Sequence, residues 1–374
     1  MVDFDDLEDN PYLLDILSQP EALRQALGKT DVSPVDPLAQ ALDGGQIDRI
    51  ILTGMGASYY GLYPAWLQLA AAGWPAIWVD AAELVHHVPA LVSERSMLWI
   101  ASQSGRSAEV MALLDQIDSR PPAALLAMTN ETSSSLAQAT MQGGETGSRV
   151  LLPLYAKPEK TPSTRTYLHT LAIGQLAALR LARNDLSLHL AALMETADGI
   201  ENYLKDWKTR MEQLGKALKG AESSIVLTGR GLSLASAFSG ALNLQEAAKI
   251  SAIGLQAAEF RHGPIEMAGT RLTALIFAGG KEDSDQAKTY NLNKKLWEEL
   301  RLMGSNAWLL KQPSPQAVLP ATGEDGVIAV PHAPGIGLPL AEIIPIQLLC
   351  VVLSLRTGIT PGEFRHIGKV TTRE

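Results

Sequence analysis

The chain has 374 residues, 46% of them hydrophobic, which is enough for about two to three domains with sizeable cores. Its net charge is −9, and no run of lysine and arginine stands out, so a nucleic-acid surface is not expected. The start of the chain lacks a signal-peptide pattern, and Glu342 and Arg356 interrupt the last apolar stretch, leaving less than the roughly 20 residues that span a bilayer. Cys350, the only cysteine, is expected to be an inert core thiol. We therefore expect a soluble, cytoplasmic protein with no membrane association.

Residues 1–45 have a helical pattern that is interrupted by prolines. We expect this segment to form a helical arm that packs on the first domain. From residue 46 onward, apolar runs alternate with helical patterns. The expected strands are residues 50–53, 76–79, 97–101 and 124–128, and the expected helices are residues 59–72, 108–117 and 134–142. This alternation predicts a parallel sheet that is covered on both faces.

A short element occurs twice, first at residues 50–58 and again at residues 225–233. Each copy is an apolar run followed by Gly-x-Gly, a hydroxyl residue and a helical pattern. This order indicates a buried strand, a tight turn and a helix N-terminus, where free N–H groups and the helix dipole favour an anion. The repeat predicts two related α/β domains, at least one of which holds a phosphorylated ligand.

Two long helices, residues 168–184 and 188–219, are expected to connect the domains. The second region then repeats the first, with strands at 225–228, 272–277, 307–310 and 327–330 and helices at 234–250 and 289–303. A last helix at 341–355 precedes a polar tail. The predicted organisation is an arm (1–45), a first domain (46–185), a connection (186–219), a second domain (220–355) and a tail that reaches the active site (356–374).

The strongest candidate site directly follows the strand at 97–101. Ser102, Gln103, Ser104, Gly105 and Ser107 lie where a strand ends and a helix begins, and ligands bind at this edge of a parallel sheet. Short hydroxyls and free N–H groups can surround a phosphate without lysine. An ordinary serine-rich helix cap is the alternative interpretation. The Gly-Ala-Ser58 turn on the neighbouring strand favours the phosphate site.

Four further positions could take part in catalysis or binding, and each also has an ordinary structural interpretation. Ser163 to Thr166 open a helix and could be a cap. Glu259 to Pro264 form a charged cluster in which His262 could transfer protons near neutral pH, unless it is a solvated loop. Glu246 lies in an apolar helix, where a carboxylate can act as a base or simply sit at the rim. Lys369 lies in the tail, where most lysines are exposed.

Other chemistries are less well supported. His86 and His87 are adjacent and cannot share a helix face, and paired cysteines are missing, so no metal site is expected. The Gly-x-Gly turns lack the third glycine of a dinucleotide fingerprint. Asp80, at the end of the next strand, keeps a dehydrogenase open as an alternative.

Taken together, these segments resemble the sugar isomerase (SIS) domain family, and most closely the double-SIS isomerase half of glucosamine-6-phosphate synthases and their stand-alone relatives. The resemblance covers residues 45–374 and implies two tandem SIS domains, each a flavodoxin-like parallel sheet flanked by helices. The glutaminase part and its N-terminal cysteine have no counterpart here, so glutamine-dependent synthesis is not expected.

The resemblance also implies roles for individual residues. Ser58, Ser102, Gln103, Ser104 and Ser107 would hold the phosphate of a sugar. Glu246 would move a proton between C1 and C2, His262 would open the ring from the partner subunit of a homodimer, and Lys369 would reach the carbonyl. Further substrate contacts would come from Ser163, Arg165, Asn243 and Glu259. No cofactor is implied.

Two positions depart from the family pattern. The synthases have lysine at the position of Asn243 and an acidic residue at the position of Ser239, which leaves the substrate open. The leading hypothesis is an amino-sugar-phosphate isomerase that converts glucosamine 6-phosphate to fructose 6-phosphate. A fructosamine-6-phosphate deglycase and a non-catalytic phosphosugar sensor are the alternatives.

Overall fold

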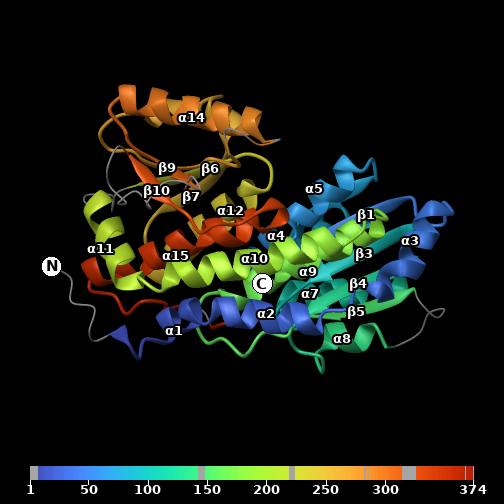
Figure 1. Cartoon of the computed structure of the whole chain (residues 1–374). Coiled ribbons are helices and arrows are strands. Elements are labelled where there is room, and N and C mark those ends of the chain that lie inside the picture. Colours follow the sequence, from blue (N-terminus) through green and yellow to red (C-terminus); the bar gives the residue numbers. More distant parts are fainter. Residues whose placement is uncertain are drawn as a thin grey trace. The chain divides into compact units, whose positions relative to one another are not determined.

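The computed structural model describes residues 7–141, 148–218, 224–281, 284, 286–313, 326–366 and 368–373. Within these residues it has two five-stranded parallel sheets, each with helices on both faces (Figure 1). The chain divides into two compact units. We call Ala22–Pro158, Arg165–Ala191 and His366–Glu374 the first-sheet unit, and Met1–Glu21, Glu159–Thr164 and Ala192–Arg365 the second-sheet unit.

The first sheet has the strand order β2-β1-β3-β4-β5, with all neighbours parallel. Its strands are β1 (Arg49–Gly54), β2 (Ala76–Trp78), β3 (Ser96–Ala101), β4 (Ala124–Thr129) and β5 (Arg149–Pro153). The helices that follow them are α4 (Gly56–Gly61), α5 (Tyr63–Ala71), α6 (Ala81–His86), α7 (Ala108–Ser119), α8 (Ser135–Ala139) and α9 (Arg165–Leu181). The four predicted strands are confirmed. β5 and α6 were not predicted, and the helix expected at 59–72 is two helices that meet at Leu62, just before Pro64.

The helices are held on the first sheet by apolar side chains on both faces. On one face, Val110 and Leu113 of α7 share a buried cluster with Ile51 of β1 and Ile100 of β3. On the other face α9 packs against α4 and α5, and a Cβ added at Gly174 would be in ordinary van der Waals contact with Leu62 and with Met128 of β4. α9 therefore covers this sheet and lies in the first-sheet unit, within the predicted bounds of the first domain (46–185).

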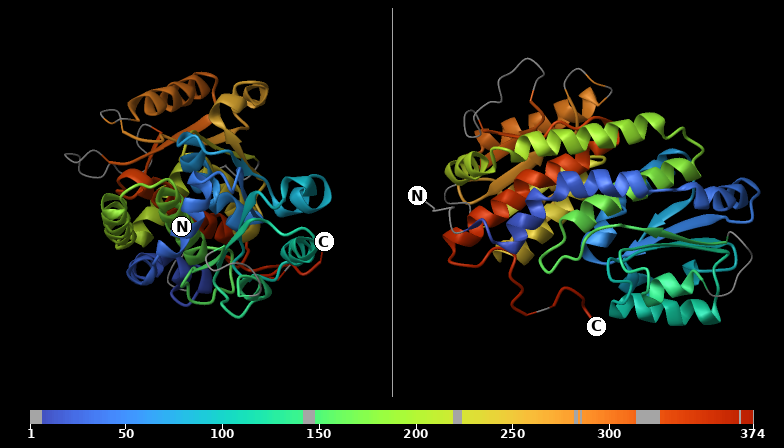
Figure 2. Two further views of the ribbon diagram at one scale, coloured as in Figure 1. Left: turned by 90° about the vertical axis from the view of Figure 1, so that its right-hand side faces the viewer. Right: turned by 60° about the horizontal axis from the view of Figure 1, so that its bottom comes forward.

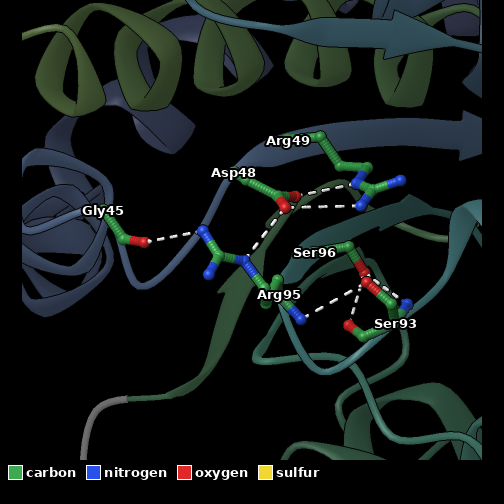
Figure 3. A network of polar contacts seen from close by, with 6 residues as sticks. All are labelled: Gly45, Asp48, Arg49, Ser93, Arg95 and Ser96. Atoms are coloured by element: carbon green, nitrogen blue, oxygen red, sulfur yellow. Dashed lines mark hydrogen bonds and ion pairs between the residues drawn. The ribbon is translucent and has the colours of Figure 1, made fainter.

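A polar network holds the ends of β1 and β3 together at the edge where these strands begin (Figure 3). The Asp48 carboxylate accepts hydrogen bonds from Arg49 Nε at 2.8 Å and Arg95 Nε at 3.0 Å, and Arg95 Nη2 also donates to the Gly45 carbonyl. The hydrogen bond from Arg49, followed by that from Arg95, holds the pKa of Asp48 below its ordinary value. This network lies at the opposite end of the strands from the candidate site.

The second sheet has the order β10-β9-β8-β6-β7, also all parallel. Its strands are β6 (Ile225–Gly229), β7 (Ala252–Gln256), β8 (Thr273–Phe277), β9 (Asn306–Lys311) and β10 (Val327–Ala329). Its main helices are α12 (Ser233–Ala248), α13 (Ala257–Phe260), α14 (Ala287–Leu302) and α15 (Leu338–Arg356). Counted from β7, the order repeats that of the first sheet, so the two predicted α/β regions have the same topology. β7 and α13 were not predicted.

The second sheet is also covered on both faces. Phe260 of α13 and Leu296 of α14 share a buried cluster with Val226 of β6 and Ile276 of β8. On the other face, a side chain at Gly240 of α12 would lie 2.6 Å from Leu227 Cδ2, so the glycine allows α12 to approach β6 closely.

One helical segment among the described residues, Gly335–Arg356, is long and apolar enough to cross a membrane, although its apolar 18-residue stretch is entirely buried inside the protein. The prediction that Glu342 and Arg356 leave too short an apolar stretch is therefore wrong. This segment, which contains α15, packs against α12 and α11 (Trp207–Ala217) as a core helix. Cys350 in α15 is buried as predicted, and burial raises the pKa of its thiol.

The N-terminal segment does not form one arm on the first sheet. It contains α1 (Pro11–Leu17), α2 (Gln19–Lys29) and α3 (Asp36–Asp43), and its described residues up to Glu21 belong to the second-sheet unit. Tyr12, Leu13 and Ile16 are fully buried, α1 contacts α15, and Asn10 Nδ2 donates to the Pro361 carbonyl. The apolar face of α1 therefore finds its core against α15.

The segment expected as one helix at 188–219 is two helices, α10 (Ser187–Leu204) and α11, which are separated at Lys205 and Asp206. The tail likewise divides, because residues up to Arg365 belong to the second-sheet unit and those from His366 onward to the first.

Candidate functional site

The Gly-x-Gly turn after β1 and the serine loop after β3 meet at one edge of the first sheet. β1 and β3 are parallel neighbours, with Gly54 paired to Ala101, so both strands end at the same level. A side chain at Gly54 would lie 2.6 Å from the Ala101 carbonyl, so only glycine permits this approach. In this strand order β2 lies on one side of β1, and β3 and the later strands lie on the other. The order in which strands are added thus reverses between β1 and β3, and open α/β sheets bind ligands at that point.

The serine loop is shaped by its own hydrogen bonds. The Gly105 N–H donates to Ser102 Oγ at 3.1 Å, and the Arg106 N–H donates to Ser104 Oγ at 3.3 Å. A hydroxyl that accepts one bond still has a proton to donate, so both serines can bind a phosphate oxygen. The loop is also held from the end of β4 and from α8, since the Asn130 N–H donates to the Gln103 carbonyl at 3.1 Å and the Leu136 N–H donates to the Gly105 carbonyl at 3.2 Å.

Ser58 and Ser107 complete the set of predicted phosphate ligands. Ser58 is half-buried in α4, directly after the turn. Ser107 is the N-cap of α7, yet within the described residues its side chain makes no capping hydrogen bond to that helix. Its hydroxyl can therefore face a ligand at the positive end of the α7 dipole.

The C-terminal tail belongs to the same unit as the serine loop. The Ala108 N–H, in the first turn of α7, donates to the Thr371 carbonyl at 3.1 Å. Figure 2 shows the red C-terminal segment lying beside the teal α7. Lys369, two residues before Thr371, is half-buried. The structure thus places Ser58, the serine loop and Lys369 in the first-sheet unit.

Three polar side chains of α12 share one stripe in the second-sheet unit, because Ser239, Asn243 and Glu246 follow at intervals of four and three residues. Ser239 and Asn243 are only 2% and 4% exposed, and Glu246 is half-buried. Among the described residues, no hydrogen-bond partner of Ser239 Oγ is present.

Charged groups surround the candidate base Glu246. Lys249, whose left-handed conformation ends α12, donates from Nζ to the carbonyls of Glu246 and Glu363. Burial lowers the pKa of Lys249 and the nearby Arg365 lowers it further, while both glutamates act in the opposite direction. The negative charge of Glu246 also contributes to the raised pKa of the buried Tyr12 phenol, after burial and Cys350.

Glu259 and His262 are exposed in the second-sheet unit, around α13. Ser163 is half-buried in the same unit, whereas Arg165 begins α9 in the first-sheet unit. Arg165 is 7% exposed and donates from Nη2 to the Pro158 carbonyl at 3.2 Å, so this guanidinium has a local structural role. The predicted site residues are therefore divided between the two units.

The second Gly-x-Gly turn carries a different arrangement. Ser233, the counterpart of Ser58, is fully buried and donates to Glu342 Oε1 at 2.8 Å. Asn293 Nδ2 donates to the carbonyls of Phe277 and Ala278, and Arg230 Nε donates to Asn293 Oδ1. Protein side chains thus occupy the polar groups of this turn, so the first turn is the better phosphate site.

Sequence analysis did not single out two buried carboxyl groups, those of Glu342 and Glu109. In the sequence Glu342 only interrupts an apolar run. The packing of α15 on α12 is what brings its carboxyl group to Ser233. Glu109, in the first turn of α7, is buried, and its Oε2 atom makes no hydrogen bond to the described residues. In the described part of the chain, no group of three or more His, Cys, Asp or Glu residues is arranged to hold a metal ion.

Part of the chain is similar to a known family. Residues 46–180, which contain the whole first sheet and α9, match the family model described as SIS domain. The match covers the first sheet, and the second sheet has the same strand order.

Two curated proteins are similar to almost the whole of this chain. The chain is 26% identical over 378 residues to the glutamine–fructose-6-phosphate aminotransferase (isomerizing) of Chlorobaculum tepidum, covering 97% of this chain and 58% of that protein. It is 27% identical to the enzyme of the same name from Pyrococcus horikoshii, with 97% and 57% covered. The chain thus spans a little over half the length of these curated relatives.

Solved structures share the fold. The C-terminal domain of glucosamine-fructose-6-phosphate aminotransferase from Francisella tularensis has a TM-score of 0.75 at 20% identity, with 99% of both chains covered. A glucosamine-6-phosphate deaminase from Thermotoga maritima has a TM-score of 0.70 at 16% identity, covering 97% of this chain and 100% of that one. Tagatose-6-phosphate ketose/aldose isomerase from Escherichia coli has a TM-score of 0.72 at 19% identity, with 95% of both chains covered.

Proposed function

We propose that this protein is a phosphosugar isomerase that converts glucosamine 6-phosphate to fructose 6-phosphate and ammonia. The observation that carries the proposal is the serine loop at the carboxyl edge of β1 and β3, with the Lys369 tail docked on the first turn of α7. The names of the similar proteins, which include a glucosamine-6-phosphate deaminase and a ketose/aldose isomerase, support the same class of substrate.

The serine loop is suited to a sugar phosphate because its hydroxyls and the α7 N-terminus supply many donors and little charge. Ser58, Ser102, Gln103, Ser104 and Ser107 hold the phosphate in this proposal. The remaining contacts are assigned to Ser163, Arg165, Asn243 and Glu259.

The reaction needs two groups that move protons and one cation. His262 opens the ring by moving a proton from the C1 hydroxyl to the ring oxygen, and in this proposal it comes from the partner subunit of a homodimer. Glu246 then takes the proton from C2 and returns it to C1 through an enolamine. The cationic Lys369 stabilises negative charge that develops on the carbonyl oxygen. Water hydrolyses the resulting C2 imine, which yields the ketose and ammonia.

Proton NMR of glucosamine 6-phosphate in D₂O, with ammonia assayed in parallel, tests the proposal. Fructose 6-phosphate formed together with ammonia is the expected result. Deuterium uptake without ammonia would keep the isomerase chemistry and reject this substrate. If neither glucosamine 6-phosphate nor fructose 6-phosphate reacts but both bind, a phosphosugar sensor replaces the enzyme.

The base is tested with Glu246→Gln, which keeps the shape of the side chain and removes its basicity. We expect kcat to fall by about 10²–10⁴-fold, with the affinity for fructose 6-phosphate unchanged, because the phosphate contacts lie elsewhere in the chain. Glu212→Gln, at an exposed position of α11, is the matched control. Full activity of the Glu246 variant would reject this mechanism.

The buried stripe on α12 favours a second candidate, a fructosamine-6-phosphate deglycase. Ser239 and Asn243 are small and neutral and lie beside Glu246 on the helix, which suits a bulkier substituent on the sugar nitrogen. Such an enzyme uses the same proton transfer. Faster turnover of glycated amino acid 6-phosphates than of glucosamine 6-phosphate would select it.

A further inference from the structure

His262 lies directly after a short segment that is braced at several points. Gln256 Oε1 accepts hydrogen bonds from the N–H groups of Ala258 and Glu259, at 2.5 and 2.8 Å, and so caps α13. The Phe260 side chain is fully buried in the apolar cluster on this face of the second sheet. The His262 N–H donates to the Glu259 carbonyl at 2.9 Å, while the residue as a whole is exposed.

An ion pair fixes this segment to the neighbouring helix α14. Arg261 Nη1 lies 2.5 Å from Glu299 Oε2, and the two side chains are only 31% and 28% exposed. α14 is itself anchored to the sheet, because Trp297 Nε1 donates to the Ala307 carbonyl at 3.1 Å and Leu300 is fully buried. Glu299 therefore offers Arg261 a fixed partner, which an exposed surface pair would not.

A second cation, Arg230, lies near Arg261 and makes the negative charge of Glu299 more important for holding Arg261 in place. The guanidinium of Arg261 contributes, after burial, to lowering the pKa of Arg230, which is held by Asn293 on α14. Without the negative charge of Glu299, Arg261 would face Arg230 alone, and like charges repel. Arg261 would then turn away from α14 and pull the backbone of the next residue, His262, with it.

We infer that Arg261 and Glu299 are positioning residues that set the location of the His262 imidazole for ring opening. This inference rests on the proposed function, in which His262 transfers the proton between the C1 hydroxyl and the ring oxygen. A displacement of about 1 Å can cost up to about 10²-fold in rate, and the other braces remain in place, so the loss expected from breaking the pair is about 10-fold.

The test measures ring opening by itself. In a Glu246→Gln background the proton transfer between carbons is blocked, and NMR exchange between the two anomers of glucosamine 6-phosphate reports only the opening and closing of the ring. Adding Glu299→Gln should lower the protein-catalysed anomer exchange about 10-fold and leave sugar-phosphate affinity unchanged. Glu298→Gln, one residue earlier and exposed, is the matched control and should have no effect.

A double variant in which the two charges are exchanged distinguishes the effect of charge from that of local packing. Arg261→Glu combined with Glu299→Arg restores the attraction and should recover most of the exchange rate, while Arg261→Glu alone should be slower than Glu299→Gln. Unchanged exchange in Glu299→Gln, or no recovery in a folded reversed pair, would overturn the inference. Failure of the proposed function gives a different result, since the wild-type protein would then not convert the sugar at all.

Discussion

Gly105 fixes the serine loop because no other residue fits its backbone and its surroundings. Its φ is +60°, and an added Cβ would lie 2.2 Å from Ser134 Oγ and 2.7 Å from Ser134 Cβ. Ser134 cannot withdraw easily, since it caps α8 by accepting a hydrogen bond from the Ala137 N–H. The loop that carries Ser102 and Ser104 thus depends on one glycine.

Gly105→Ala should therefore affect both stability and ligand binding. The left-handed backbone and the clash together should cost about 2–4 kcal/mol of unfolding free energy. We also expect sugar-phosphate affinity to fall at least about 10-fold, because a shifted loop misplaces several donors. Thermal unfolding and calorimetric titration with fructose 6-phosphate measure the two effects.

Gly73→Ala is the control for the backbone term alone. Gly73 has a φ of +86° but nothing within 4 Å of an added Cβ. This variant should lose only about 1 kcal/mol and bind normally. If Gly105→Ala binds as tightly as Gly73→Ala, the serine loop is not the phosphate site.

Among the elements, α15 shows how packing changes the chemistry of a side chain. Burial raises the pKa of Glu342 from its ordinary 4.5 to about 8, although hydrogen bonds from Ser233 and Ser236 act in the opposite direction. The carboxyl lies at the N-terminus of α12, whose first turn carries both serines. A neutral carboxyl is therefore favoured in the folded protein near pH 7.

This pKa predicts how stability changes with pH. In the unfolded chain Glu342 ionises near pH 4.5, and in the folded protein only near pH 8. Its contribution to stability is then fully present below pH 4.5 and is lost as the pH rises toward 8. Glu342→Gln cannot ionise, so its unfolding free energy should fall less than that of wild type between pH 5 and pH 9.

Chemical denaturation at several pH values measures this difference, and Glu212→Gln, at an exposed position of α11, should follow the wild-type curve. Parallel curves for wild type and Glu342→Gln would show that the carboxyl ionises normally. The direction of the effect does not depend on how the other titrating groups behave, because they are common to both proteins.

The helices and strands show which elements can be predicted from sequence patterns. The central strands of both sheets were identified because both of their faces are buried, which gives continuous apolar runs such as β3. The edge strands β5 and β7 were missed because they lack a continuous buried run: β5 alternates between buried and half-buried residues, and only the first residue of β7 is buried. The continuity of residues 188–219 was overestimated, since helical periodicity persists across the break near Asp206.

The site follows the same rule. The serine loop and the Gly-x-Gly turn are contiguous in sequence, so their types and spacing were sufficient to predict them. Pairs such as Arg261 with Glu299 join residues far apart in the chain, and only the fold brings them together. The roles assigned to Glu246, His262 and Lys369 stay predictions, because they depend on a bound substrate.

At the scale of the whole molecule, the two sheets preserve one topology while their equivalent turns differ in chemistry. After β1 the turn leads to Ser58, which is half-buried, next to a loop rich in hydroxyls. After β6 the turn leads to Ser233, which is fully buried and bonded to Glu342. The loop after β8 offers Ala278, Gly279 and Gly280 in place of the serines. In the proposed function the first copy binds the ligand, while the second uses its serine for packing.

This divergence predicts opposite effects of one substitution at the two equivalent serines. Ser58→Ala should weaken fructose 6-phosphate binding about 10-fold with little change in stability, because it removes a donor to the phosphate. Ser233→Ala should leave the affinity unchanged and lower the unfolding free energy by about 1–3 kcal/mol, because it leaves a buried carboxyl oxygen unpaired. Calorimetric titration of both variants also gives the stoichiometry, which should be one sugar phosphate per chain. Two sites per chain, or weaker binding in Ser233→Ala, would mean that the second turn has kept the ligand-binding function.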